Sequence, residues 1–401
     1  MNTAQPDRTL AQIVKVVSIQ PIEGADKIEL ARVLGWDVVV KKDEFKVGDL
    51  GVYFGIGAIL DKDNPYTSFL EGKVLKTKTI RGVLSQGLLG PMSWLPTTNT
   101  STTDVSTTDA STTDIPFNTN FKEDDDVTVV MNVKKWIPTD ELYLYNTKND
   151  NTVSTFPECI PKTDENRIQN TKHLSTLKGN NIIITQKYDG TSTTFAYING
   201  EFLICSRNNR LLLETSNNTH FYKMARKYDV EQKMKMVCTI SNTNNNTNNT
   251  ENNTENNTEN NTNNTENNTN NVKNNVKNNN INMNIAIQGE TIGPKIGNNR
   301  HKVSELDFYV FNIYNIDLQV YMNHEDVKCL STQMGLKMVP VVYDGSMQEE
   351  WLTVKYFLKL ADEQRYDTGE LCEGIVIKSN HEYARTSFKA ISNKYLLKHK
   401  I

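Results

Sequence analysis

The chain has few of the features that mark secreted, membrane-spanning or zinc-binding proteins. Only five cysteines occur among 401 residues; they are scattered, and none forms a C-x-x-C pair. Neither a disulfide framework nor a cysteine zinc site is expected, and a reducing compartment is favoured. No run approaches 18 apolar residues, and the opening "MNTAQPDRTLAQ" contains no apolar signal region. We therefore expect an intracellular protein, cytoplasmic or nuclear, that is not secreted and has no membrane partner.

An excess of positive charge is also missing. Lysine and arginine number 44 against 48 acidic residues, which gives a formal net charge of −4. This balance excludes a chain that coats nucleic acid along its whole length, but it leaves room for a local basic surface.

Large apolar residues are scarce in two low-complexity segments, which lower the hydrophobic content to 37%. The first is the repeat "STTDVSTTDASTTDI" at 101–115, and the second is the Asn-rich tract at 241–280. Neither can bury enough apolar surface to offset the entropy of ordering. We predict disordered inserts at about 97–116 and 241–280.

The rest of the sequence forms two blocks, in keeping with about two or three domains for this length. Residues 9–140 contain short β-type runs separated by turn signals such as "PIEGADK" and "KVGDLG", a pattern that predicts a small antiparallel barrel. Residues 166–401 mix strand patterns with helical ones, which predicts an α+β domain. We expect a first domain over 1–140, a linker over 141–165 and a second domain over 166–401.

One lysine stands out in the second block. Lys187 ends an apolar β run and is followed by the turn residues Asp189 and Gly190, in "ITQKYDGTSTTFAYING". Burial and nearby cationic groups push such a lysine toward its neutral, nucleophilic form. The alternative for an isolated K-x-D-G is an exposed turn lysine.

Five further stretches follow in order and support the first interpretation. They are "CSRNN" (205–209), "IQGETIGP" (287–294), "DFYVFNIY" (307–314), "EGIVIK" (373–378) and "SFKAISNKYLLK" (387–398). Together with "KYDG", this series resembles the covalent nucleotidyltransferases, which include ATP-dependent RNA and DNA ligases and capping guanylyltransferases. Residues 9–95 and the junction "FPECIPKTDENRIQN" (156–170) resemble one branch of ATP-dependent RNA ligases, which carries an N-terminal OB-fold domain.

The resemblance implies an α+β protein: an OB-fold β-barrel followed by a nucleotidyltransferase domain, an ATP-grasp-like antiparallel-sheet ligase. It also implies ATP as co-substrate, Mg²⁺ or Mn²⁺, and sealing of 5′-phosphate to 3′-hydroxyl RNA ends, preferably at duplex nicks, through lysyl-AMP and adenylylated RNA. Lys187 would be the nucleophile. Catalytic roles fall on Asp189, Glu290, Glu373 and Lys389, with Glu373 also the metal ligand, through water. The nucleotide-binding residues implied are Gln186, Lys187, Gly190, Arg207, Glu290, Phe311, Lys378 and Lys389.

Alternation within "DFYVFNIY" places Tyr309, Phe311 and Ile313 on one strand face, and the residues between them on the other. We expect Phe311 to stack on adenine, although an ordinary core aromatic would fit the same pattern. Arg207 would hold either the ribose or an RNA phosphate.

Two positions depart from the family pattern. Many relatives have glutamate before the motif lysine, where this chain has Gln186; its amide can donate or accept, so guanine is not excluded. Some ligases also have lysines two apart in the last motif, but two residues after Lys389 stands Ile391. Lys394 or Lys398 could supply the second charge.

Other readings of the chain predict different partners. DNA ligases and capping enzymes normally carry an OB domain after the nucleotidyltransferase domain; the sequence given ends twelve residues past Lys389, which favours an RNA ligase. The alternative of a non-catalytic OB-fold RNA-binding factor conflicts with the complete motif set.

We expect the protein to be a monomer that binds RNA. Lys76, Lys78 and Arg81, in "GKVLKTKTIRG", would contact its phosphates, unless they form an ordinary solvated strand face.

Overall fold

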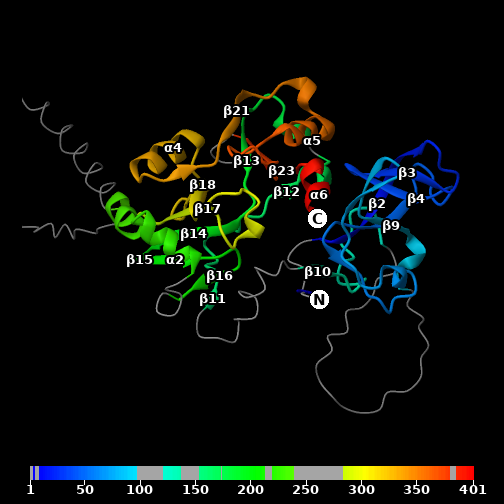
Figure 1. The fold of residues 1–401 in the computed structure, drawn as a ribbon, viewed down its shortest axis with the longest axis horizontal. Helices are drawn as coiled ribbons and strands as arrows, with labels where there is room; N and C mark the ends of the chain where they lie inside the picture. The colour runs from blue at the N-terminus through cyan, green and yellow to red at the C-terminus, as the bar shows by residue number, and fades with distance from the viewer. Residues whose placement is uncertain are drawn as a thin grey trace, which may run out of the picture.

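The computed structural model describes residues 3–4, 9–96, 121–136, 153–172, 174–212, 219–238, 283–379 and 385–401. Both predicted inserts, 97–116 and 241–280, lie outside these ranges. Figure 1 shows a smaller N-terminal β domain beside a larger domain that mixes strands and helices, so the α+β class is confirmed.

The N-terminal domain is built on a five-stranded antiparallel sheet with the order β4-β3-β2-β5-β9. Apolar residues alternate along its strands and form two clusters, one containing Ile13 and Phe54 and the other Val38 and Tyr53. A separate hairpin, β7–β8, lies beside β4, where the Val39 N–H donates to Ser85 Oγ, and a small sheet, β1-β10-β6, completes the domain. The strands are β1 Thr3–Ala4, β2 Ala11–Pro21, β3 Ile28–Val33, β4 Trp36–Lys41, β5 Leu50–Phe54, β6 Ala58–Ile59, β7 Thr77–Ile80, β8 Val83–Gln86, β9 Leu88–Pro91 and β10 Lys134–Trp136.

The second domain contains two sheets. The larger has the order β11-β16-β15-β14-β17-β18-β19, with β20 beside β18; the smaller has the order β12-β23-β22-β13-β21. Their strands are β11 Val153–Thr155, β12 Asn166–Arg167, β13 Asn181–Lys187, β14 Thr191–Ile198, β15 Glu201–Cys205, β16 Asn209–Leu211, β17 Ile285–Ile292, β18 Asp307–Asn315, β19 Val320–Tyr321, β20 Lys337–Met338, β21 Val341–Ser346, β22 Gly374–Ser379 and β23 Ser387–Ile391.

Four helices with described bounds cover these sheets, and each starts at a side chain that caps it. Thr219, Asn323, Thr353 and Ser392 each accept a hydrogen bond from a backbone N–H of the first turn, as expected of N-cap residues. The helices are α2 His220–Lys227, α4 His324–Gln333, α5 Val354–Glu363 and α6 Asn393–His399; residues 230–238 are also helical. No helix in the described part of the chain is long and apolar enough to span a membrane.

The segment before β12 is packed against the larger sheet rather than standing apart from it. Within 141–165, expected as a linker, residues 141–152 lie outside the described ranges. β11 pairs with β16, and Phe156 and Ile160 are buried in a cluster with strands β14 and β15. Residues 153–165 therefore contact the ligase domain closely, which matters for any truncation.

The predicted alternation in β18 is wrong beyond Phe311. The pairing with β17 shifts by one residue at Phe311, which is a β-bulge. As a result Ile313 is buried with Phe308 and Val310 in one cluster, whereas Tyr309 and Phe311 pack against another. A bulge inserts an unpaired residue and redirects the side chains that follow it.

The two domains meet through backbone and side-chain hydrogen bonds. Gly35 N–H donates to Gln169 O at 2.8 Å, and the Trp36 indole donates to Asn170 Oδ1 at 2.7 Å. A Cβ on Gly35 would lie 2.7 Å from the Gln169 Cα, so only glycine permits this approach. On the hairpin, Thr77 N–H donates to Ile401 O at 3.0 Å. These contacts place the N-terminal domain against both β12 and the end of α6.

Candidate active site

All ten residues predicted for nucleotide chemistry line one pocket of about 230 Å³ between the two sheets of the second domain. β13 carries Lys187 at its end, and β14 and β17 bring Gly190 and Glu290 from the other sheet. The ten are Gln186, Lys187, Asp189, Gly190, Arg207, Glu290, Phe311, Glu373, Lys378 and Lys389.

The Lys187 amine lies 2.6 Å from Glu373 Oε2, with the lysine side chain 25% exposed and the glutamate 17%. Register explains the contact, because Lys187 on β13 pairs with Gly374 at the start of β22. Burial lowers the pKa of Lys187. The carboxylates of Glu373, Glu290 and Asp189 raise the same pKa by more than burial lowers it, so the net shift is upward. The expectation that this lysine is already pushed toward its neutral form is therefore wrong for this structure, because the carboxylates outweigh burial.

Glu290 faces the same lysine from the opposite sheet. Its Oε1 accepts a hydrogen bond of 3.1 Å from the Gly190 N–H. A Cβ at Gly190 would lie 2.3 Å from the Thr291 carbonyl oxygen and 3.0 Å from Glu290 Cγ, which explains the glycine. Burial raises the pKa of Glu290 to about 8, against the pull of Lys187. Burial likewise raises the pKa of Glu373. Two buried carboxyls of high pKa around one ammonium favour binding of additional positive charge.

The Asp189 side chain is held by Arg300 and Tyr395, to which the sequence analysis assigned no role although Tyr395 lies within the stretch 387–398. Arg300 donates to Asp189 Oδ2 at 2.7 Å, and the Tyr395 hydroxyl donates to the same oxygen. The Asp189 backbone N–H is shared between His301 Nε2 and the Tyr366 hydroxyl, each at 3.2 Å. Burial lowers the pKa of His301 to about 4, so its ring is neutral and can accept. Asp189 therefore orients the turn after the lysine.

The Tyr366 hydroxyl joins three of the site's backbone segments. It accepts from the N–H groups of Asp189 (3.2 Å) and Glu373 (3.0 Å), and it donates to the Lys187 carbonyl at 3.3 Å. Its ring is 4% exposed and stacks on His301 at 3.7 Å between ring centroids. The sequence analysis did not identify Tyr366 as a site residue, because it lies between a helix and "EGIVIK" and belongs to no motif.

Besides Lys187, three basic side chains are described as lining the pocket, and two of them bind a carboxylate from the segment before β12. Arg207 and Lys389 each contact Asp164, at 2.7 Å in both cases, one on each carboxylate oxygen. Lys378 donates to the Phe311 carbonyl at 2.7 Å and to Asn312 Oδ1 at 2.8 Å. Burial and, secondarily, Arg385 lower the pKa of Lys378 to about 7. Arg207, Lys378 and Lys389 thus all line the pocket.

The candidates for a second charge after Lys389 do not line this pocket. Ile391 is 2% exposed, Lys398 pairs with Glu370 at 2.6 Å, and Lys394 lines a different cavity. The RNA-binding candidates are elsewhere too: Lys76 and Lys78 flank the start of β7 in the N-terminal domain and are exposed, and Arg81 lies in the turn of the hairpin.

Comparisons with known proteins agree with this architecture. Residues 180–391 match the RNA ligase family, and residues 10–92 match an OB-fold domain. A Naegleria gruberi RNA ligase mutant (glutamate to alanine) solved with ATP and Mn aligns with a TM-score of 0.75 and 29% identity, covering 98% of this chain and 100% of that one. A lysine-to-alanine mutant of the same ligase, also with ATP and Mn, gives 0.74 and 30% over 98% and 99% of the two chains. Among curated proteins, no sequence matches.

A third solved structure, a glutamate-to-alanine mutant of the Naegleria ligase with AMP and Mn, aligns with a TM-score of 0.74 and 29% identity over 98% of this chain and 99% of that one. The family match spans more than half of the sequence, so the chain belongs to the RNA ligase family. It is an RNA ligase family enzyme with an N-terminal OB-fold domain and an antiparallel-sheet ligase domain.

Proposed function

We propose that this enzyme seals 5′-phosphate to 3′-hydroxyl RNA ends at duplex nicks, using ATP and passing through lysyl-AMP and adenylylated RNA. The observation that carries the proposal is the Lys187 amine, 2.6 Å from Glu373 in a pocket lined by every predicted nucleotide-site residue. An amine in a pocket that is lined by both carboxylates and cations suits transfer of a nucleotidyl group.

In the first step the Lys187 nitrogen attacks the α-phosphorus of ATP. The new P–N bond replaces the bond to pyrophosphate, and the amine must lose a proton; Glu373 is the nearest carboxylate that can take it. Lys389 and Arg207, which line the pocket, would neutralise phosphate charge as it develops, which is how most phosphoryl-transfer sites work. Asp189, held by Arg300 and Tyr395, keeps the lysine turn in position.

The Gln186 amide is oriented in a way that favours adenine over guanine. Its Nε2 donates to the Arg365 carbonyl at 2.9 Å, and a carbonyl can only accept, so the amide cannot be turned round. Its Oε1 is buried and has no hydrogen-bond partner among the described residues, and Gln186 is one of the residues that line the pocket. A buried acceptor of this kind fits the adenine 6-amino group and would repel the carbonyl of guanine. Phe311, which lines the same pocket, would stack on the base.

The site fits a divalent metal held mostly by water and phosphate. Oxygen donors suit Mg²⁺ or Mn²⁺, and burial raises the pKa values of Glu290 and Glu373, which supports the proposal because a nearby cation would stabilise both carboxylates. No cluster of three metal-ligating side chains occurs among the described residues. Glu373 and Glu290 would therefore hold the ion, which when bound supplies charge that favours the neutral form of Lys187.

In the later steps an oxygen of the RNA 5′-phosphate attacks the lysyl-AMP phosphorus and the Lys187 amine leaves. The 3′-hydroxyl then attacks the 5′-phosphorus and AMP leaves. These steps need both RNA ends aligned, and positioning of this kind is worth many kcal/mol. We assign RNA binding to the OB-fold domain, residues 1–140. Lys76, Lys78 and Arg81 on its surface would contact the RNA.

The direct test is intact-mass measurement after incubation with ATP and Mg²⁺. We expect the protein to gain one AMP, and Lys187→Ala to gain none, while GTP in place of ATP labels poorly. An AMP that remains attached to the Lys187→Ala protein would show that another residue is the nucleophile. Labelling with GTP as fast as with ATP would contradict the assignment of Gln186.

A further inference from the structure

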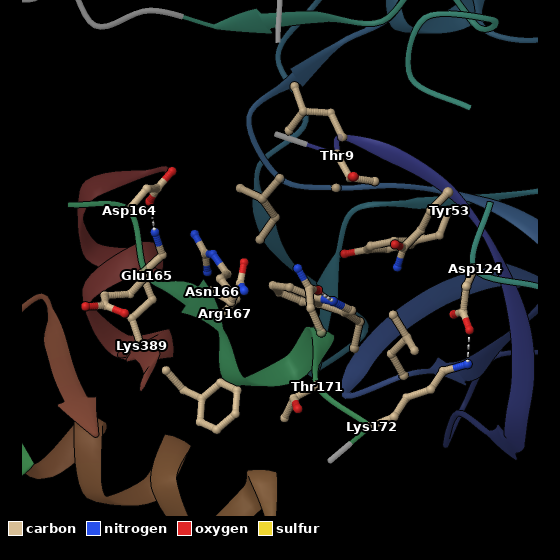
Figure 2. A pocket seen from close by; sticks show the side chains of 18 residues that line it. Thr9, Tyr53, Asp124, Asp164, Glu165, Asn166, Arg167, Thr171, Lys172 and Lys389 are labelled. Atoms are coloured by element: carbon tan, nitrogen blue, oxygen red, sulfur yellow. Dashed lines mark hydrogen bonds and ion pairs between the residues drawn. The ribbon is translucent and has the colours of Figure 1, made fainter. Parts of the chain in front are cut away.

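Two cavities of similar size lie between the OB-fold and ligase domains. Figure 2 shows the first, about 650 Å³; Asp164, Glu165 and Lys389 line both this cavity and the nucleotide pocket, so it belongs to the site already described. The second, about 680 Å³, shares none of the residues described as lining that pocket. It lies where strands β2, β3 and β8 face helices α5 and α6 (Figure 1), and we name it the α5 groove.

Helix α5 has more apolar surface than its own core uses. Phe357 and Ala361 are fully buried against the small sheet of the ligase domain. A second apolar pair one turn apart, Val354 and Leu358, packs at the edge of the same core, remains half-buried and lines the groove. A surface helix usually carries polar residues outside its core-facing stripe. The second stripe is therefore available to something that lies in the groove.

The OB-fold domain supplies the other half of this apolar floor. Leu30 on β3 and Leu84 on β8 are half-buried and line the groove opposite α5. On the β7–β8 hairpin, Leu84 pairs with Thr79, whereas Lys78 pairs with Ser85 one position along. Side chains of successive pairs point to opposite faces of a hairpin. The groove thus uses the face opposite to Lys78, which is a candidate for RNA contact.

Three lysines surround the apolar floor and carry its unbalanced charge. Lys355 and Lys359 lie one turn apart on α5, and Lys394 lies on α6; all three are exposed and line the groove. Among the described residues, none of their amines forms an ion pair. The groove therefore offers several ammonium groups to a ligand of negative charge.

Most of the carboxylates that line the groove already have partners. Asp37 binds Arg32 through two hydrogen bonds of 2.8 and 2.9 Å. Asp362 Oδ1 accepts from the Ser392 hydroxyl at 2.7 Å and from the backbone N–H of residue 394 at 3.1 Å. Glu363 is exposed and is the remaining carboxylate described as lining the groove. Positive charge therefore outweighs negative charge around the floor.

We propose that the α5 groove binds a peptide segment of a partner protein that carries acidic and aliphatic side chains. Aliphatic residues would fill the floor and carboxylates would meet the three lysines, as in other interfaces with an apolar centre and a polar rim. RNA fits less well, because no aromatic side chain is described among the lining residues to stack on bases. A phosphate backbone would also leave the four aliphatic side chains unused. The proposal does not depend on the chemistry at Lys187.

The experiment uses the full chain and phage-displayed random short peptides as the probe. Selected peptides should be enriched in aspartate or glutamate together with leucine, isoleucine or valine, relative to the starting library. A selected peptide is then synthesised with a fluorophore, and its binding is measured by anisotropy at several salt concentrations. Lys359→Glu should weaken binding about tenfold at low salt and less at high salt. Val354→Thr, which keeps the side-chain shape but adds a hydroxyl, should weaken it about threefold.

Lys328→Glu on α4 is the matched control. Lys328 and Lys359 are both exposed near the middle of ten-residue helices, but Lys328 does not line the groove. The Lys328→Glu protein should bind the peptide as the unmodified protein does.

Four outcomes would overturn the proposal. Selection without the acidic and aliphatic composition would mean that no such site exists. Equal effects of Lys328→Glu and Lys359→Glu would place the peptide elsewhere. Displacement of the peptide by nicked RNA, together with weaker RNA binding by Lys359→Glu, would assign the groove to RNA. A dimer in sedimentation that Lys359→Glu dissociates would make a second copy of this chain the occupant.

Discussion

Lysines occupy two different environments in the two domains of this enzyme. Lys187 is half-buried against Glu373, within a pocket whose carboxyls have raised pKa values. Lys76 and Lys78 are exposed on the β7 hairpin of the OB-fold domain, where water screens them. The difference fits the proposed roles: a nucleophilic lysine would depend on a fixed, buried environment, whereas binding of RNA phosphates would need only positive charge at the surface. The predictions below test this contrast.

The largest expected effect comes from loosening the buried site while leaving its charges in place. Tyr366→Phe removes the hydroxyl that joins Lys187, Asp189 and Glu373 but keeps the ring on His301. We expect the rate constant for lysyl-AMP formation to fall about 10- to 100-fold, with a smaller change in the ATP concentration for half-maximal rate.

Tyr53→Phe is the matched control, because Tyr53 is equally buried and its hydroxyl donates to the Gln86 carbonyl in the OB-fold domain. It should leave lysyl-AMP formation unchanged even if the melting temperature drops. Equal losses of rate in the two variants would mean that Tyr366 matters only for stability.

The sequence predicted this buried site well where motifs run along strands. Gln186, Lys187 and Glu373 meet because β13 and β22 pair in register, and the apolar runs beside them indicated both strands. It could not indicate Tyr366 or Arg300, since these act through the fold, far from the motifs that they support.

The bulge at Phe311 could not be predicted from the alternation of side chains either, because that alternation assumes a strand whose pairing with its neighbour is uninterrupted. Its consequence is local: Phe311 still lines the pocket, but Ile313 turns to the opposite face.

A smaller effect is expected from the exposed lysines. The double variant Lys76→Ala/Lys78→Ala should weaken RNA binding by roughly tenfold and lower the slope of log affinity against log salt by about two, because under the proposal each lysine would contact phosphate without reading the base. Lysyl-AMP formation should not change. Titration of RNA at several salt concentrations provides the measurement, and an unchanged slope would show that the hairpin does not touch RNA.

The smallest effect concerns Lys378, whose pKa is lowered to about 7 by burial and by Arg385. At pH 8 its amine is mostly neutral, and phosphate charge nearby would raise its pKa again. ATP binding at pH 8 should therefore take up as much as about one proton through this residue.

Calorimetry in two buffers of different ionisation enthalpy, without divalent metal, measures the uptake. Lys378→Met should take up fewer protons than the unmodified protein. The same uptake in both proteins would place the proton on another group.

The measurement that tests the contrast most directly compares the full chain with a truncated protein starting at residue 153. The start is set by β11, Phe156 and Ile160, which pack against the ligase domain and must be kept. Lysyl-AMP formation and sealing of nicked RNA are followed side by side on both proteins. We predict that the truncated protein still forms lysyl-AMP at a similar rate but seals nicks poorly. If the truncated protein sealed nicks as fast as the full chain, the OB-fold domain would not be the part of the enzyme that binds RNA.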